Sequence, residues 1–107
     1  MNEPEVVLWS GSADMLSDGN FLGGTLRVTS ARAAFRAFWW TTEPDVEVPL
    51  GVIAAVSMCS LSSANVNGIE LVDSRGGSWR FLVPDPAAAA QAVGHIVATY
   101  GRPAPYR

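Results

Sequence analysis

Apolar and polar residues alternate with a period of two along most of this chain. Such alternation predicts half-buried β-strands, because successive side chains of a strand point to opposite faces. Short alternating or continuously apolar stretches of this kind occur at residues 6–9, 25–29, 33–40, 46–50, 52–56, 69–71 and 78–83. Clusters of Gly, Pro, Asn and Asp separate them, and residues 74–77 form the clearest hairpin turn. The sequence therefore predicts seven short strands, with a polar loop over residues 11–20 between the first two.

The hydrophobic period changes to 3.6 near the end of the chain. One apolar stripe is formed there by Ala89, Ala92, Val93, Ile96, Val97 and Tyr100. Asp85 is a favourable N-cap residue, and Pro86 suits the first helical position because its fixed φ matches that of a helix. Gly101 and Pro103 follow the stripe and are typical of a helix end. These residues predict an amphipathic helix over residues 86–100.

Seven strands of this length can form either a sandwich or a strongly bent barrel, and the single helix must bury its apolar stripe against them. The most economical arrangement places the helix over the open end of a barrel, where its small Ala residues allow close approach. We therefore expect a mainly β fold, a seven-stranded antiparallel bent barrel capped by one C-terminal α-helix. Residues 1–101 are expected to form one domain, since 107 residues suit a single domain, and residues 102–107 a short tail.

Four segments carry a resemblance to a known family. They are residues 24–35 (GTLRVTSARAAF), 48–53 (VPLGVI), 68–71 (GIEL) and 79–81 (WRF). Their order and spacing resemble the GRAM domain, a member of the pleckstrin-homology-like (PH-like) superfamily, over roughly residues 5–100. The resemblance implies a PH-like fold and a non-catalytic binder of membrane lipids, phosphoinositides or proteins. It also implies that headgroup binding would use basic residues near the first hairpin loop, whereas that loop carries Asp14 and Asp18 here and no basic residue.

Charge is sparse in this sequence. Charged residues make up 16% of the chain, against about 25% in an average domain, and the net charge is −3. All seven basic residues are Arg. A sequence-independent nucleic-acid binder needs a dense basic face, so the composition excludes nucleic acid as a partner.

Further features of the sequence bear on its location. The longest apolar run, residues 50–56, is too short to span a membrane, and the acidic segment 1–5 lacks the regions of a signal peptide. A single Cys excludes an intrachain disulfide and fits a reducing compartment. We therefore expect a cytoplasmic protein, and peripheral attachment to a membrane is the alternative location. The Arg-only, Ala-rich composition is typical of a GC-rich bacterial genome.

Few residues offer catalytic or metal-binding chemistry. Cys59 and His95 could form a nucleophilic pair only if they were adjacent in space and oriented by a third group. The sequence favours Cys59 as a small packed residue and His95 at the boundary of the helix stripe. One Cys and one His cannot supply the ligands of a zinc site, and Glu43, Asp45 and Glu47 are typical of a solvated strand edge. We expect no catalytic residue, no metal and no cofactor.

The doubled tryptophan, Trp39-Trp40, is the strongest functional signal. Adjacent strand residues point to opposite faces, so both rings cannot lie in one core. Two interpretations stay open: the bend of the sheet or the helix covers the second face, or an exposed aromatic patch marks a binding site. Phe38 shares the face of Trp40, and Arg36 could supply a polar component.

These observations favour a non-catalytic interaction module that acts through protein–protein or self-association contacts at the aromatic patch. The alternative is peripheral lipid binding, in which a Trp ring inserts and arginines touch headgroups. A small enzyme using Cys59 and His95 is a distant third hypothesis. The candidate binding residues are Arg27, Arg36, Phe38, Trp39, Trp40 and Arg75.

Overall fold

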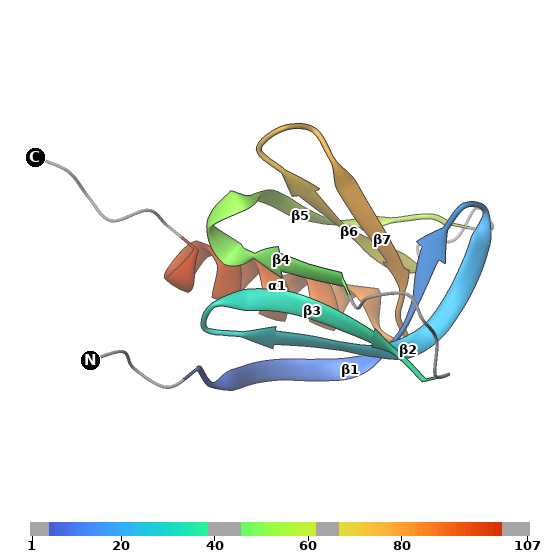
Figure 1. Ribbon diagram of the computed structural model, residues 1–107, viewed down its shortest axis with the longest axis horizontal. Helices are drawn as coiled ribbons and strands as arrows, with labels where there is room; N and C mark the ends of the chain where they lie inside the picture. Colours follow the sequence, from blue (N-terminus) through green and yellow to red (C-terminus); the bar gives the residue numbers. More distant parts are fainter. Residues whose placement is uncertain (1–4, 39–45, 62–66, 102–107) are drawn as a thin grey trace, which may run out of the picture.

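The computed structural model describes residues 5–38, 46–61 and 67–101 (Figure 1). Within these ranges the chain forms seven strands, one short 3₁₀ turn and one α-helix. In order they are β1 (Val7–Ser17), β2 (Asn20–Thr29), β3 (Arg32–Ala37), β4 (Val46–Pro49), η1 (Leu50–Val52), β5 (Ile53–Cys59), β6 (Gly68–Asp73), β7 (Ser78–Leu82) and α1 (Pro86–Tyr100).

The strands form one antiparallel sheet in the order β4-β3-β2-β1-β7-β6-β5. A short pairing of Asp14 and Met15 of β1 with Leu82 and Phe81 of β7 joins the two halves. Figure 1 shows the β1–β4 half and the β5–β7 half crossing at an angle, with α1 behind them. Among the described residues β4 and β5 are not paired, so the sheet is bent but open. The expected mainly β fold with one C-terminal helix is confirmed, although the barrel does not close.

The first hairpin differs from the sequence prediction. Residues 11–17, expected to be loop, continue β1, which pairs with β2 as far as Ser17 and Asn20. The turn is only Asp18 and Gly19, whose φ angles of 52° and 80° suit a two-residue hairpin. The inward positions of this part of β1 include Gly11 and Ala13, and such small side chains give almost no hydrophobic signal. The loop prediction was therefore wrong because the alternation was hidden.

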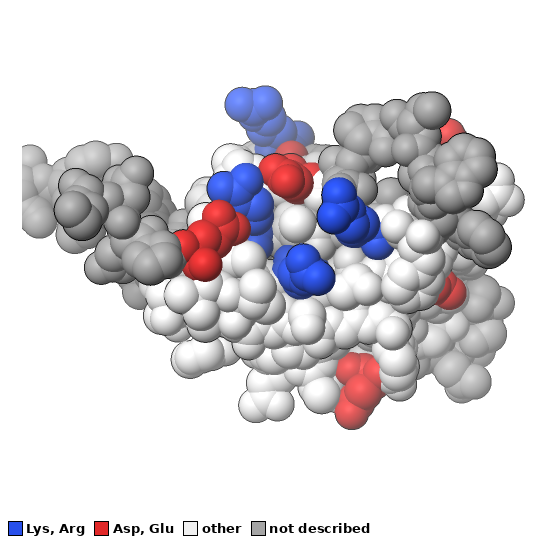
Figure 2. Space-filling view, turned by 60° about the horizontal axis from the view of Figure 1, so that its bottom comes forward, with Lys and Arg blue, Asp and Glu red and all other residues white. Residues whose placement is uncertain are grey.

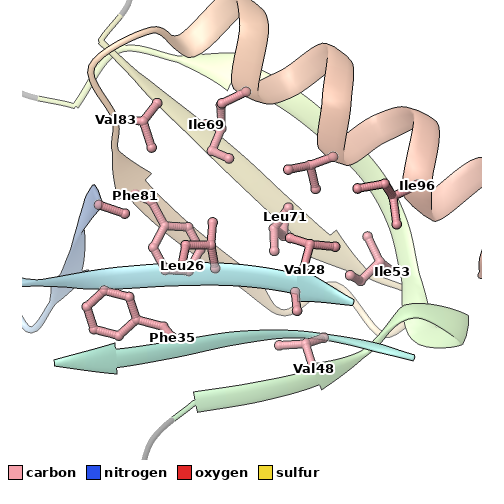
Figure 3. Close-up of a cluster of buried hydrophobic side chains, with 14 of the residues drawn as sticks. Leu26, Val28, Phe35, Val48, Ile53, Ile69, Leu71, Phe81, Val83 and Ile96 are labelled. Atoms are coloured by element: carbon pink, nitrogen blue, oxygen red, sulfur yellow. The ribbon is translucent and has the colours of Figure 1, made fainter. Parts of the chain in front are cut away.

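The core lies between the two halves of the sheet and α1. Buried apolar side chains from the strands and the helix fill it, including Leu26, Val28, Phe35, Val48, Ile53, Ile69, Leu71, Phe81, Val83 and Ile96 (Figure 3). The rings of Phe35 on β3 and Phe81 on β7 have centroids 5.7 Å apart. This contact, with the ring planes tilted by 43°, joins the halves of the sheet across the core.

The helix begins and ends where the sequence predicts. The Asp85 carboxylate accepts a hydrogen bond of 3.1 Å from the backbone N–H of Ala88, as an N-cap should. Gly101 is needed for a different reason than expected, because its φ of −88° is right-handed. A Cβ there would lie 2.7 Å from the carbonyl oxygen of Leu50, so glycine lets the helix end approach η1. Tyr100, predicted in the apolar stripe, is half exposed.

Two adjacent glycines of β2 provide a matched test of this packing. A Cβ on Gly24 would collide with the backbone of Arg36 and lie 2.7 Å from the ring of Phe35, whereas one on Gly23 would meet only side-chain atoms, at 3.3 Å and beyond. We expect Gly24→Ala to lower the free energy of unfolding by about 1–3 kcal/mol through overpacking. Gly23→Ala should change it by less than about 0.5 kcal/mol. Urea denaturation of both variants measures this, and equal stabilities would contradict the packing.

Candidate functional site

The outer face of β2, β3 and β4 carries two of the candidate arginines. Arg27 of β2 lies opposite Ala34 of β3, which in turn lies opposite Glu47 of β4. One pleat further along, Arg36 lies opposite Thr25. Arg27 and Arg36 are therefore diagonal neighbours on adjacent strands, a relation that places Cα atoms about 7–8 Å apart.

A shallow depression of about 400 Å³ lies on this face. It is lined by Thr25, Arg27, Ala34, Phe35, Arg36, Ala37, Phe38 and Glu47. Figure 2 shows Arg and acidic side chains interspersed over this side of the molecule, surrounded by uncharged surface. The structure thus brings together Arg27, Arg36 and Phe38, three of the six residues singled out from the sequence.

Phe38 follows β3 directly and is the most exposed large apolar residue among those described, at 67%. Its backbone N–H donates a 2.9 Å hydrogen bond to the carbonyl oxygen of Gly23, which extends the pairing of β3 with β2 by one residue. A Cβ on Gly23 would lie 3.7 Å from Cδ2 of Phe38, so the ring sits close to the bare backbone of this glycine. The pairing of Leu16 with Phe21 continues the face toward the β1–β2 turn, and Phe21 is also exposed.

The opposite end of this face is closed by an ion-pair cluster. Nε of Arg32 lies 3.0 Å from Oε2 of Glu5, and its Nη1 donates a 3.1 Å hydrogen bond to Oε1 of Glu47. The Glu47 hydrogen bond, followed by the charge of Glu5, raises the pKa of Arg32. Thr29 adds a 2.6 Å hydrogen bond from its hydroxyl to Glu5. Sequence patterning gave no sign of this cluster, because it joins residues far apart in the chain.

Arg27 contrasts with Arg32. It is exposed, and within the described ranges it has neither an ion-pair nor a hydrogen-bond partner for its side chain. Glu47, two strands away in the same row, is engaged by Arg32. A guanidinium in this situation presents its planar fork of N–H donors to solvent, ready for a carboxylate or phosphate.

The remaining candidate residues lie elsewhere. Trp39 and Trp40 fall outside the described residues, as do Glu43 and Asp45. Arg75 lies in the β6–β7 turn, where its backbone N–H donates a 2.8 Å hydrogen bond to Asp73, and it does not line the depression. Sequence alternation alone could not show that Arg75 lies apart from Arg27 and Arg36.

Cys59 and His95 form no hydrogen bond with each other in the described part of the chain. Cys59 ends β5 and is partly buried, whereas His95 is exposed on α1. Burial raises the pKa of the Cys59 thiol, Glu70 raises it further, and Arg80 opposes them. These effects make the thiol a weaker nucleophile at neutral pH.

The described residues contain no cluster of three or more potential metal ligands and no helix able to cross a membrane.

No protein-family model matches the sequence, and no curated protein matches it. Solved structures do match. The C-terminal domain of an unknown protein from Leishmania infantum superimposes with a TM-score of 0.77 at 14% identity, over 88% of this chain and 85% of that one. The N-terminal PH domain of human ARAP2 superimposes with a TM-score of 0.64 at 17% identity, over 87% of this chain and 77% of that one. The Slm1 PH domain in complex with inositol-4-phosphate superimposes with a TM-score of 0.62 at 14% identity, over 87% of this chain and 96% of that one.

A second Slm1 PH structure, in complex with phosphoserine, superimposes with a TM-score of 0.61 at 14% identity. Likeness at this level of identity concerns the fold. The chain therefore has a PH-like fold, as the sequence resemblance implied. Membership of the GRAM family stays a prediction.

The surroundings of Cys59 predict how fast it reacts with iodoacetamide. The thiolate is the reacting form, so a pKa raised above the ordinary 9.0 leaves less of it at mildly alkaline pH than in a free thiol. Glu70→Gln removes a charge that raises this pKa and should speed alkylation. Arg80→Gln removes a charge that lowers it and should slow alkylation. Rates followed by mass spectrometry across a pH series test both signs, and identical pH profiles for the three proteins would contradict them.

Proposed function

We propose that this chain is a non-catalytic binding module with a PH-like fold that binds a protein partner through Arg27, Arg36 and Phe38, here called the Arg–Phe surface. The observation that carries the proposal is the exposed ring of Phe38 beside two arginines at one depression. Aromatic and Arg side chains are the residue types that contribute most binding energy in protein interfaces.

The chemistry of the surface describes the partner that would fit it. Phe38 offers an apolar contact of the size that one side chain of a partner can cover. Arg27 offers a bidentate pair to a carboxylate or phosphate, and within the described residues no carboxylate of the chain competes for it. The partner would therefore carry an acidic group next to an apolar one. Trp39 and Trp40 follow Phe38 in sequence, and we include them as candidate members of this surface.

Two truncations should weaken partner binding without unfolding the protein, because both side chains are exposed. We expect Phe38→Ser and Arg27→Gln each to raise the dissociation constant about tenfold, the effect of losing about 1.4 kcal/mol at a hot spot. Arg75→Gln is the matched control, since Arg75 lies outside the depression. Affinity capture with the wild-type chain identifies the partner, and titrating it against wild type and the three variants gives four dissociation constants. A partner that binds Phe38→Ser as tightly as wild type would refute this surface.

Peripheral lipid binding is a second candidate function, and one observation favours it. The structurally similar Slm1 PH domain has been solved with inositol-4-phosphate and with phosphoserine, both of which carry a phosphate group. Arg27 and Arg36 could hold such a group on the outer face of β2 and β3. The β1–β2 turn, formed by Asp18 and Gly19, carries no basic residue that could do so.

Vesicle sedimentation separates the two candidates. If lipid is the ligand, the chain should bind vesicles of phosphatidylcholine with phosphatidylinositol-4-phosphate at low salt. Arg27→Gln should then lower the partition coefficient about fivefold, since one basic residue near an anionic surface contributes about 1 kcal/mol. Arg75→Gln should leave the partition coefficient unchanged. Absence of wild-type sedimentation at low salt would exclude lipid and leave the protein partner.

A further inference from the structure

Charged residues are absent from one continuous part of the molecule. Every Asp, Glu, Lys and Arg in the described ranges lies outside β5, η1 and α1. The helix α1 has 15 residues, and about half of them are exposed, yet the exposed ones are Ala, Gln, His, Thr and Tyr. A surface helix ordinarily carries charged residues on its solvent side. The solvent side of α1 is therefore unusual in being neutral.

The helix and β5 lie side by side and form one surface. A Cβ on Gly94 of α1 would lie 4.0 Å from Cβ of Val56 on β5. Helical spacing aligns Ala87, Gln91, Gly94 and Ala98 along this flank of α1. On β5 the exposed residues are Ala54, Ala55, Ser57 and Met58. We call these eight residues the neutral face.

The β5 edge also lacks the features that usually prevent strands from pairing with other chains. Within the described residues β5 pairs only with β6, and no other strand of these ranges pairs with its second edge. Natural sheet edges are commonly short or carry charges or Pro. The opposite sheet edge, β4, has all three features: four residues, Glu47 and Pro49. β5 has seven residues and none of these, apart from a bulge near Ala54 at its start.

We propose that a second copy of this chain packs on the neutral face about a two-fold axis, with the two β5 edges antiparallel and the α1 flanks beside them. A two-fold axis brings the same surface patch of the two copies together, and a charged side chain close to the axis would be repelled by its own counterpart. The neutral face has no such charge. Its Ala and Gly residues let two backbones approach closely, and antiparallel edges satisfy each other's free N–H and C=O groups.

A second copy fits this face better than a lipid surface does. An interfacial helix needs basic residues and large apolar side chains, whereas α1 has no Lys or Arg and contributes only Ala, Gln and Gly to the neutral face. The proposal does not rest on the Arg–Phe surface, whose residues come from β2 and β3. A dimer would instead carry two such surfaces, which would increase avidity for a partner with repeated sites.

Sedimentation-velocity centrifugation of the intact chain over a wide concentration range tests the proposal. We expect the mass to approach twice 11.3 kDa at high concentration. Ser57→Lys on β5 and Ala98→Glu on α1 should each raise the dimer dissociation constant at least tenfold, because each introduces a charge into a contact that has none. The matched controls are Ser78→Lys, an exposed serine on β7, and Ala88→Glu, an exposed alanine on the other flank of α1. Both controls should dimerise like wild type, and circular dichroism verifies that all four variants are folded.

Three results would overturn the proposal. The first is a wild-type chain that is monomeric at every concentration. The second is a dimer that Ser57→Lys and Ala98→Glu leave intact. The third is a dimer weakened by Phe38→Ser but not by these two variants, which would assign self-association to the Arg–Phe surface. None of these results depends on whether that surface also binds a partner.

Discussion

The two halves of the bent sheet share one apolar core, and the other features of the molecule depend on this shared burial. Phe35 and Phe81 belong to strands that are not neighbours in the sheet, yet their rings meet across the core. The sheet alone would leave this core open to water at one end. The buried side of α1 covers it with Ala89, Val93 and Ile96, which removes apolar surface from water and holds the halves at a fixed angle.

The candidate site follows from the same burial. A strand has a fixed period of two, so burying Leu26 and Val28 in β2 forces Arg27 onto the outer face. Burying Phe35 in β3 does the same for Arg36. The register between β2 and β3, which Gly24 permits by letting the strands approach closely, then sets the two arginines diagonally beside each other. The buried residues of β2 and β3 therefore determine which backbone positions the two arginines occupy.

Alternation and end signals were enough to predict most of the strands and the whole helix, because large inward residues and the Asp85 cap have strong signatures. The first hairpin could not be predicted, since Gly11 and Ala13 occupy inward positions without a hydrophobic signal. The site was predictable only in part. Alternation puts Arg36 and Phe38 on one face, but strand register and the pairing of Arg32 with residues far away in sequence depend on the folded sheet.

The few charged residues of the sequence are unevenly distributed over the surface, which composition alone does not reveal. If solubility alone determined the surface, α1 would be a favourable place for charge, because Lys and Glu are good helix formers and its exposed Ala positions have room for them. The charges are instead concentrated on the other elements, where some form ion pairs and Arg27 stands ready for an external anion. The sheet edge next to α1 is equally neutral, although β4 shows that the same chain can protect an edge. The helix and the edge strand are adjacent, and both lack charged residues. A single contact that excludes charge from both explains this better than two independent losses of charged residues.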